Sequence, residues 1–172
     1  MKITCRTVYD FRTLSAMSLV MRKTIRRRFN RLVSIYLWAV AALLAVSIWL
    51  SLDKPLRVVW YGAALILLLA VQLRQDAVNA FFARRRLIPG TRESRTVFYP
   101  DCYEVAFPGA ATRWEYGKPL LLAETRDYFV LVLGEHHAQA FPKNGLEGGG
   151  ADEFRSLLER ATGKCIQTIG RW

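Results

Sequence analysis

Residues 32–52 read LVSIYLWAVAALLAVSIWLSL and residues 58–73 read VVWYGAALILLLAVQL, and neither run contains a formally charged side chain. At a rise of 1.5 Å per residue, α-helices over these runs are about 31 Å and 24 Å long, while a bilayer hydrocarbon core is about 30 Å thick. Arg57 and Arg74 flank the shorter run, and arginine side chains that reach towards the headgroups lengthen such a span. Because only residues 53–57 separate the two runs, we predict an antiparallel transmembrane hairpin.

A buried core helix and a cleaved signal peptide both fit residues 32–52 less well than a membrane span. A helix in the core of a soluble protein is seldom so long and so uniformly apolar. A secretory signal peptide has an apolar region about half this length, and a cleavage site with small residues follows it. No such site follows this run cleanly. Both comparisons favour a membrane-spanning helix.

The distribution of charge predicts the topology. The 172 residues include 25 Lys and Arg against 14 Asp and Glu, a formal net charge of +11. Residues 1–31 contribute +8 and residues 96–172 carry −2, so the positive excess lies beside the apolar runs. A nucleic-acid-binding domain would carry its basic patch on its own surface, so we expect no nucleic-acid partner. Since only Lys54 and Arg57 lie between the runs, the positive-inside rule places both termini in the cytoplasm, in a two-span protein of the plasma membrane.

The basic residues nearest the cytoplasmic ends of the two spans form a group that we call the basic collar. Each basic residue near an anionic leaflet is attracted by on the order of 1 kcal/mol, so we predict that the basic collar contacts anionic lipids. The hairpin is expected to bring both ends of the collar to the same depth. Its members are Arg22, Lys23, Arg26, Arg27, Arg28, Arg31, Arg84, Arg85 and Arg86.

The N-terminal arm, residues 1–31, is predicted to be a basic amphipathic helix. No Pro or Gly interrupts it, and apolar residues such as Leu14, Met17 and Met21 recur every three or four positions. The helix lies in the headgroup layer, packs back on the cytoplasmic domain, or runs straight into the first span. Its charges are equally compatible with a role in setting topology alone.

The remainder of the chain is predicted to be a basic connector helix, 74–89, followed by a β domain, 90–172. Pro89-Gly90 ends the connector, and the pattern then changes to the period of two that is typical of strands. A helix capped by Asp152 follows the strands, with Phe154 and Leu158 on its apolar face. The predicted strands are 95–99, 102–107, 111–116, 120–125, 128–133 and 137–141.

The predicted fold class is therefore an α+β membrane protein. An N-terminal amphipathic helix and a two-helix transmembrane hairpin over residues 32–73 precede a small antiparallel β-barrel or sandwich with a C-terminal helix. About 80 residues are enough to bury a modest core, so we expect residues from about 90 onward to fold without the membrane.

Several motifs resemble those of the YcxB-like family of bacterial membrane proteins. They are Tyr9-Asp10 before the basic helix, Arg113-Trp114-Glu115, the stretch 124–131, the stretch 141–144 and the stretch 152–158. The resemblance covers essentially the whole chain, and its motifs are strand and helix residues without catalytic content. It implies a C-terminal domain similar to pleckstrin-homology folds, and a family with no assigned biochemical activity. The chain departs from the family pattern at the glycine run 148–150 and in the tail 165–172.

The chain contains histidines, cysteines and a glycine run, but their spacing does not match that of a metal site or a phosphate-binding loop. His136 and His137 are adjacent, so on a strand they point to opposite faces and cannot share a metal ion. The three cysteines lack the paired spacing of a zinc site and are expected to be free thiols in a reducing compartment. The glycine run 148–150 is not followed by the Lys-Ser/Thr of a phosphate loop. We expect no metal, no cofactor and no enzymatic activity.

Three further conspicuous side chains are expected to have structural roles. Glu124 and Asp127 flank a predicted turn between strands, and we expect both to be solvated. Trp114 is expected to pack in the sheet or the core, rather than to form a platform for a ligand.

Two functions of different classes remain. The first is a membrane-anchored interaction or regulatory module without catalytic activity, whose β domain binds a protein, a peptide or a lipid headgroup at the inner membrane face. The second is a small membrane immunity or transport-accessory protein that acts through its hairpin. Gly62-Ala63-Ala64 would then give a close-packing face for another membrane helix, including one from a second copy of the chain. The expected partners are a bilayer with anionic lipids and an unidentified protein.

Overall fold

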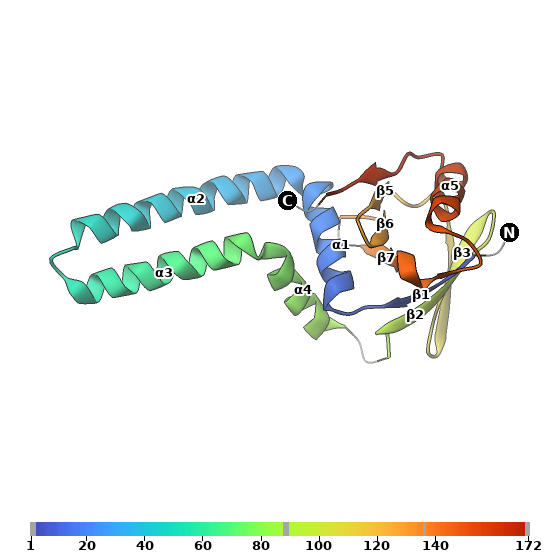
Figure 1. Ribbon diagram of the computed structural model, residues 1–172, viewed down its shortest axis with the longest axis horizontal. Coiled ribbons are helices and arrows are strands. Elements are labelled where there is room, and N and C mark those ends of the chain that lie inside the picture. The colour runs from blue at the N-terminus through green and yellow to red at the C-terminus, as the bar shows by residue number, and fades with distance from the viewer. Residues whose placement is uncertain (1–2, 88–89, 136, 171–172) are drawn as a thin grey trace.

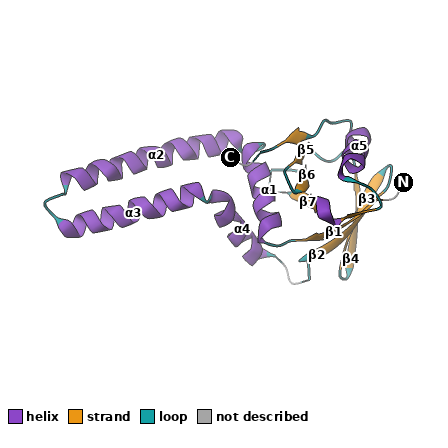
Figure 2. Ribbon diagram, in the orientation of Figure 1, coloured by secondary structure: helices purple, strands orange, loops and turns teal. Residues whose placement is uncertain are grey.

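Two long antiparallel helices, α2 (Arg27–Leu50) and α3 (Pro55–Leu73), extend from one side of an α+β domain (Figure 1). The structure is a computed structural model that describes residues 3–87, 90–135 and 137–170. Within these ranges the chain forms five α-helices and two β-sheets (Figure 2).

The helical hairpin has almost no protein packed around it. In the most apolar part of each helix, 6% of α2 and 0% of α3 is buried. A soluble protein would cover its core helices, whereas these two are exposed as well as long and apolar enough to cross a membrane. Both helices begin earlier than predicted, α2 at Arg27 and α3 at Pro55, whose fixed φ suits the first helical turn.

The first sheet has five strands in the order β4-β3-β2-β1-β8, and β1 lies in its interior. β1 pairs antiparallel with β2 along its whole length, from Ile3 opposite Phe98 to Val8 opposite Glu93. Its side chains are buried alternately, so β1 follows the period of a strand with one face on the core. The strands are β1 (Ile3–Val8), β2 (Glu93–Phe98), β3 (Cys102–Phe107), β4 (Ala110–Glu115) and β8 (Leu146–Glu147).

The prediction of one helix over residues 1–31 is therefore wrong for residues 3–8. Ile3, Thr4, Thr7 and Val8 are β-branched, so the local sequence does carry a strand signal. The prediction missed it because it extended the helical period of the residues that follow back to residue 1, and the strand that pairs with this segment lies far along the chain. The helix α1 (Phe11–Lys23) begins after Asp10, whose Oδ1 accepts a hydrogen bond from the Thr13 backbone N at 2.8 Å. Of the arrangements considered for the arm, α1 adopts the one that packs back on the β domain.

The second sheet has the order β7-β6-β5-β9 and is covered on both faces. Phe129 and Leu131 of β6 point into the core between the sheets, and Val130 and Val132 pack against α1 on the other face. A strand buried on both faces is apolar throughout, which explains the sequence YFVLV of β6. The strands are β5 (Leu121–Glu124), β6 (Tyr128–Val132), β7 (Ala138–Pro142) and β9 (Gln167–Thr168), and β9 runs parallel to β5.

An aromatic cluster holds the two sheets and the helix α5 (Ala151–Thr162) together. The ring centroid of Phe98 lies 4.7 Å from that of Phe154, 5.1 Å from Phe141 and 5.6 Å from Tyr103. These four side chains come from β2, α5, β7 and β3. Ile3 belongs to the same core and is fully buried, so β1 supplies part of the interior of the domain.

The six predicted strands of the β domain are all present, each with ends shifted by at most two residues. The connector is the helix α4 (Gln75–Arg86), and Pro89, its predicted end, lies outside the described residues. The helix α5 begins after Gly150 rather than at a cap formed by Asp152. The Glu153 carboxylate accepts a hydrogen bond from the Gly150 backbone N at 3.1 Å, so a side chain inside the first turn satisfies this end of the helix. β8 and β9, of two residues each, are too short to leave a pattern in the sequence.

Candidate functional site

The helix α1 lies between the second sheet and α4, so it connects the β domain to the hairpin (Figure 1). Leu19 and Val20 of α1 are buried against the sheet. Ala80 of α4 is fully buried, and small residues at such positions let two helices approach closely. The hairpin and the domain are thus joined through packed helices as well as through the chain itself.

Arg22 and Asp76 join the same two helices by a two-point ion pair. Arg22 Nε lies 2.8 Å from Asp76 Oδ1, and Arg22 Nη2 lies 2.7 Å from Asp76 Oδ2. The hydrogen bonds to this carboxylate raise the pKa of the Arg22 guanidinium above its ordinary value. Both side chains are partly shielded from solvent, and parallel hydrogen bonds between an arginine and a carboxylate are stronger than those of neutral groups.

Two further members of the basic collar make hydrogen bonds to loops of the domain. Lys23 Nζ donates to the Gly170 carbonyl at 2.7 Å. Arg26 donates to the Glu135 carbonyl through Nε at 3.2 Å and Nη2 at 3.1 Å. Arg22, Lys23 and Arg26 thus bond the C-terminal end of α1 and the turn after it to α4 and to two loops of the domain.

The other six members of the basic collar are exposed, and they form two separate groups. One group lies in the first turns of α2 and the other in the last turn of α4. α4 does not continue α3 in a straight line but turns aside at Arg74 and runs antiparallel to α1 (Figure 1). The two groups are therefore separated along α4, a helix of 12 residues or about 18 Å. They are Arg27, Arg28 and Arg31 on α2, and Arg84, Arg85 and Arg86 on α4.

Glu124 is buried in an ion-pair cluster, and the prediction that it is solvated is wrong. Its carboxylate accepts hydrogen bonds from Arg155 Nε at 2.9 Å and Nη2 at 2.8 Å, and from Lys143 Nζ at 2.5 Å. These bonds, with Arg155 first, hold the pKa of Glu124 below its ordinary value, although burial opposes the shift. The cluster connects β5, α5 and the segment after β7, and no local pattern in the sequence indicates it. Asp127 is exposed, as predicted.

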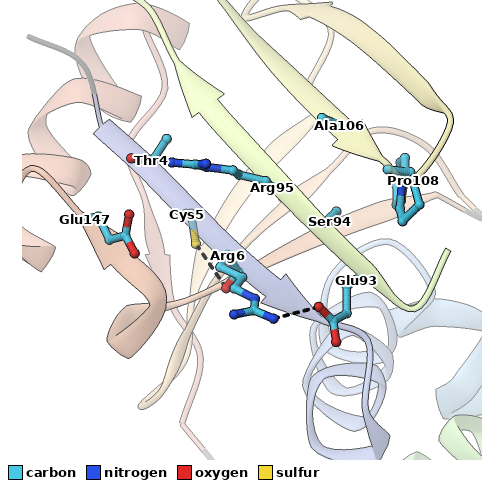
Figure 3. A pocket seen from close by; sticks show the side chains of 10 residues that line it. Thr4, Cys5, Arg6, Glu93, Ser94, Arg95, Ala106, Pro108 and Glu147 are labelled. Atoms are coloured by element: carbon cyan, nitrogen blue, oxygen red, sulfur yellow. Dashed lines mark hydrogen bonds and ion pairs between the residues drawn. The ribbon is translucent and has the colours of Figure 1, made fainter. Parts of the chain in front are cut away.

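A hollow of about 490 Å³ lies over β1 and β2 on the outward face of the first sheet (Figure 3). Arg6 and Arg95 occupy directly opposed positions on these strands, where like charges repel. Arg6 Nη2 pairs with Glu93 Oε2 at 2.8 Å, and Arg95 extends across β1 towards Thr4. The lining residues are Thr4, Cys5, Arg6, Glu93, Ser94, Arg95, Ala106, Phe107, Pro108 and Glu147.

Trp114 is half-buried at the edge of the first sheet, as the sequence suggested. Its ring is stacked on that of His137, with centroids 5.8 Å apart, and Lys118 Nζ lies 5.8 Å from the Trp114 ring. The other predicted histidine, His136, lies outside the described residues.

The cysteines and acidic residues form no reactive centre in the part of the chain that the structure describes. Cys5 and Cys102 are buried, Cys165 is exposed, and all three are free. Burial raises the pKa of the Cys5 thiol to about 12, so this group is not a thiolate near neutral pH. Among the described residues no three His, Cys, Asp or Glu side chains gather as a metal site would require.

No protein-family model, curated protein or solved structure matches this chain. Three features of the structure bear on function. They are the exposed hairpin, the packing of α1 against α4 with its Arg22–Asp76 ion pair, and the hollow on the first sheet.

Proposed function

We propose that the chain is a non-catalytic interaction module, anchored in a membrane by α2 and α3, whose domain binds a protein or peptide partner at the inner membrane face. The observation that carries this proposal is the hairpin. Helices of 24 and 19 residues, about 36 Å and 28 Å long, match a hydrocarbon core of about 30 Å. Their exposed apolar surfaces would otherwise face water.

The distribution of basic and aromatic residues supports an orientation with the domain in the cytoplasm. Lys54 and Arg57 are the basic residues of the distal turn, whereas the end next to the domain carries most of the basic collar. Trp49 and Trp60 are exposed near the distal turn, at a height where aromatic rings favour the membrane–water interface.

The outward face of the first sheet is the proposed docking surface for the partner. Arg6, Arg95 and Ala106 are exposed there, and the hollow over β1 and β2 leaves room for an extended segment. A pleckstrin-homology-like barrel, as the resemblance to the YcxB-like family implies, is part of this proposal. The order of two spans, antiparallel strands and a C-terminal helix supports it.

The hairpin itself is the second candidate for the functional surface, as in an immunity or transport-accessory protein. Ala63 and Ala64 are exposed on α3, and a Cβ added at Gly62 would meet no other atom within 4 Å. These small residues are therefore available to another membrane helix, either of a partner or of a second copy.

Cysteine labelling tests the anchoring and its orientation. A cysteine introduced as Ser51→Cys, after α2, should react with a membrane-impermeant maleimide added to intact cells, whereas Cys165 should react only after permeabilisation. Cys165 is exposed, so its reaction in permeabilised cells is the matched control. Labelling of Cys165 but not of Ser51→Cys in intact cells would contradict the orientation. If the chain is found in the soluble fraction of broken cells, with both cysteines labelled to the same extent, the anchoring is contradicted.

Photo-crosslinking separates the two candidate surfaces. A photoreactive amino acid at Ala106 should give a discrete adduct if the sheet binds the partner. The same amino acid at Ala63 should give a discrete adduct if the hairpin binds the partner. Adducts at Ala63 alone would move the functional surface to the hairpin.

A further inference from the structure

The helix α4 has two chemically different faces. Towards α1 it presents Ala80, which is fully buried, and Ala83 and Asp76, which are partly buried. Asp76 is held there by Arg22. This face is fully explained by packing against α1.

The opposite face of α4 carries exposed aromatic and basic residues. Phe81 is 47% exposed and Phe82 is 52% exposed, and their rings meet edge to face with centroids 5.7 Å apart. The Arg85 guanidinium carbon lies 4.5 Å from the centroid of the Phe81 ring. Arg86, four residues after Phe82, is exposed on the same face, and Arg84, four residues after Ala80, is exposed at the edge of this face. Two phenylalanines and three arginines are therefore exposed at one end of the helix.

The position of α4 decides what this face can meet. α4 contacts α1 and α3, and α1 separates it from the strands (Figures 1 and 2). Because α4 turns aside at Arg74, it lies across the base of the hairpin instead of extending the line of α3. The face opposite α1 is therefore turned away from the β domain, on the side from which the hairpin projects.

From these observations we infer that α4 is an interfacial helix that inserts Phe81 and Phe82 between the headgroups of an anionic bilayer, with Arg84, Arg85 and Arg86 on the lipid phosphates. This inference rests on the proposed membrane anchoring. It adds a second contact with the bilayer, made by side chains outside the spans.

Two features favour a bilayer over a protein as the occupant of this face. The first is continuity, since α4 begins where α3 ends and the bilayer that surrounds α3 extends beside it. The second is charge, because three neighbouring arginines complement anionic phosphates. An interfacial helix typically pairs aromatic residues with Lys or Arg and lies about 5–10 Å below the headgroup boundary.

The test measures the depth of a fluorophore on the full-length chain in vesicles of phosphatidylcholine and phosphatidylglycerol. Cys165→Ser removes the exposed thiol, and Cys5 and Cys102 are buried. An environment-sensitive dye is then attached in turn to Phe82→Cys on α4, Ile66→Cys on α3 and Ser156→Cys on α5. Ile66 is exposed within a span, and Ser156 is exposed on the domain, so they are the matched deep and aqueous controls. Quenching by lipids with a nitroxide in the headgroup region or deep in the acyl chain reports the depth.

The expected result is strong quenching of the Phe82→Cys dye by the shallow nitroxide, of the Ile66→Cys dye by the deep nitroxide, and no quenching of the Ser156→Cys dye. Replacing Arg84, Arg85 and Arg86 by Gln should reduce the shallow quenching severalfold in these vesicles while leaving the Ile66→Cys signal unchanged. Loss of quenching at Ile66→Cys would refute the membrane anchoring and the interfacial helix together.

Two other outcomes would overturn the interfacial helix and leave the anchoring intact. In the first, Ile66→Cys is quenched and the Phe82→Cys dye emits as in water. In the second, the Phe82→Cys dye emits as in an apolar environment but no lipid nitroxide quenches it, so a protein, including a second copy of this chain, covers the face.

Discussion

Arg22, in the last turn of α1, and Asp76, in the first turn of α4, are joined by two parallel hydrogen bonds of 2.8 Å and 2.7 Å. The two residues are 54 positions apart, and the whole hairpin lies between them. The pair therefore closes a loop between α1 and α4 and adds hydrogen bonds to the packing of these two helices. It lies at the junction where the hairpin meets the domain.

The first prediction concerns this pair. Asp76→Asn should lower the free energy of unfolding by about 1–2 kcal/mol, because hydrogen bonds to a charged group are replaced by weaker ones in a partly exposed site. The loosened junction should also be cut faster by trypsin at Arg26, Arg27 and Arg28. Thermal unfolding in detergent and timed proteolysis measure the two effects. Asp53→Asn, the same change in the distal turn, is the control, and equal cleavage of both variants would contradict the role of the pair.

The second prediction concerns the acid stability of the domain. Because Arg155 and Lys143 lower the pKa of Glu124 below its ordinary value of 4.5, the folded state is stabilised fully above about that pH. This stabilisation is lost as the pH falls through the lowered pKa, when the carboxylate is protonated. Glu124→Gln should lower the free energy of unfolding by about 2–3 kcal/mol at pH 7. This is somewhat less than the effect of removing one partner from a fully buried ion pair, because Lys143 and Arg155 both keep some contact with water.

The difference between Glu124→Gln and the natural sequence should shrink as the pH falls below about 4.5. Glu115→Gln, at an exposed position on β4, provides the matched control and should leave the stability nearly unchanged. Thermal unfolding measured from pH 7 to pH 3 checks both variants. A constant difference across this range would show that the cost arises from packing and not from the charge.

The third prediction concerns the N-terminal strand. A fragment of residues 90–172 should be molten or aggregated, since it lacks β1, which lies between β2 and β8, and the buried side chains of Ile3 and Cys5. Residues 1–23 joined to residues 90–172 by a flexible linker should unfold cooperatively. Near-ultraviolet circular dichroism and thermal melting distinguish the two chains. A cooperative transition of the fragment 90–172 would contradict this prediction. It would show instead that residues from about 90 onward fold by themselves, as the strand pattern of the sequence suggests.

The fourth prediction compares two buried tyrosines. In the described part of the chain the Tyr103 hydroxyl has no hydrogen-bond partner, whereas the Tyr116 hydroxyl donates to the Tyr99 carbonyl at 2.9 Å. Burial raises the pKa of both phenols, so both are neutral in the folded domain. Tyr103→Phe should be neutral or stabilising, while Tyr116→Phe should lower the free energy of unfolding by about 1 kcal/mol, because it removes the hydrogen bond that the Tyr116 hydroxyl donates. Equal losses in chemical denaturation would contradict the assignment of these hydroxyls.

The sequence by itself determined the features that depend on neighbouring residues. The uncharged runs 32–52 and 58–73 specify long exposed helices, because length and composition alone decide whether a helix is apolar all round. The short alternating or apolar runs after residue 90, separated by turn residues, specify six strands.

Only the tertiary structure decided which distant residues meet. β1 pairs with β2, more than eighty positions away, so its six residues give a local strand signal but do not identify the strand beside which they lie. The position of Glu124 is not evident from the sequence, because a carboxylate at the end of a strand is ordinarily solvated. It becomes part of the interior only when Arg155 and Lys143 neutralise it. Arg22 belongs to the basic collar by its position, yet its hydrogen bonds are directed to Asp76. Local patterns record the period of a segment, whereas pairing across the fold depends on contacts between distant segments that form only when the chain folds.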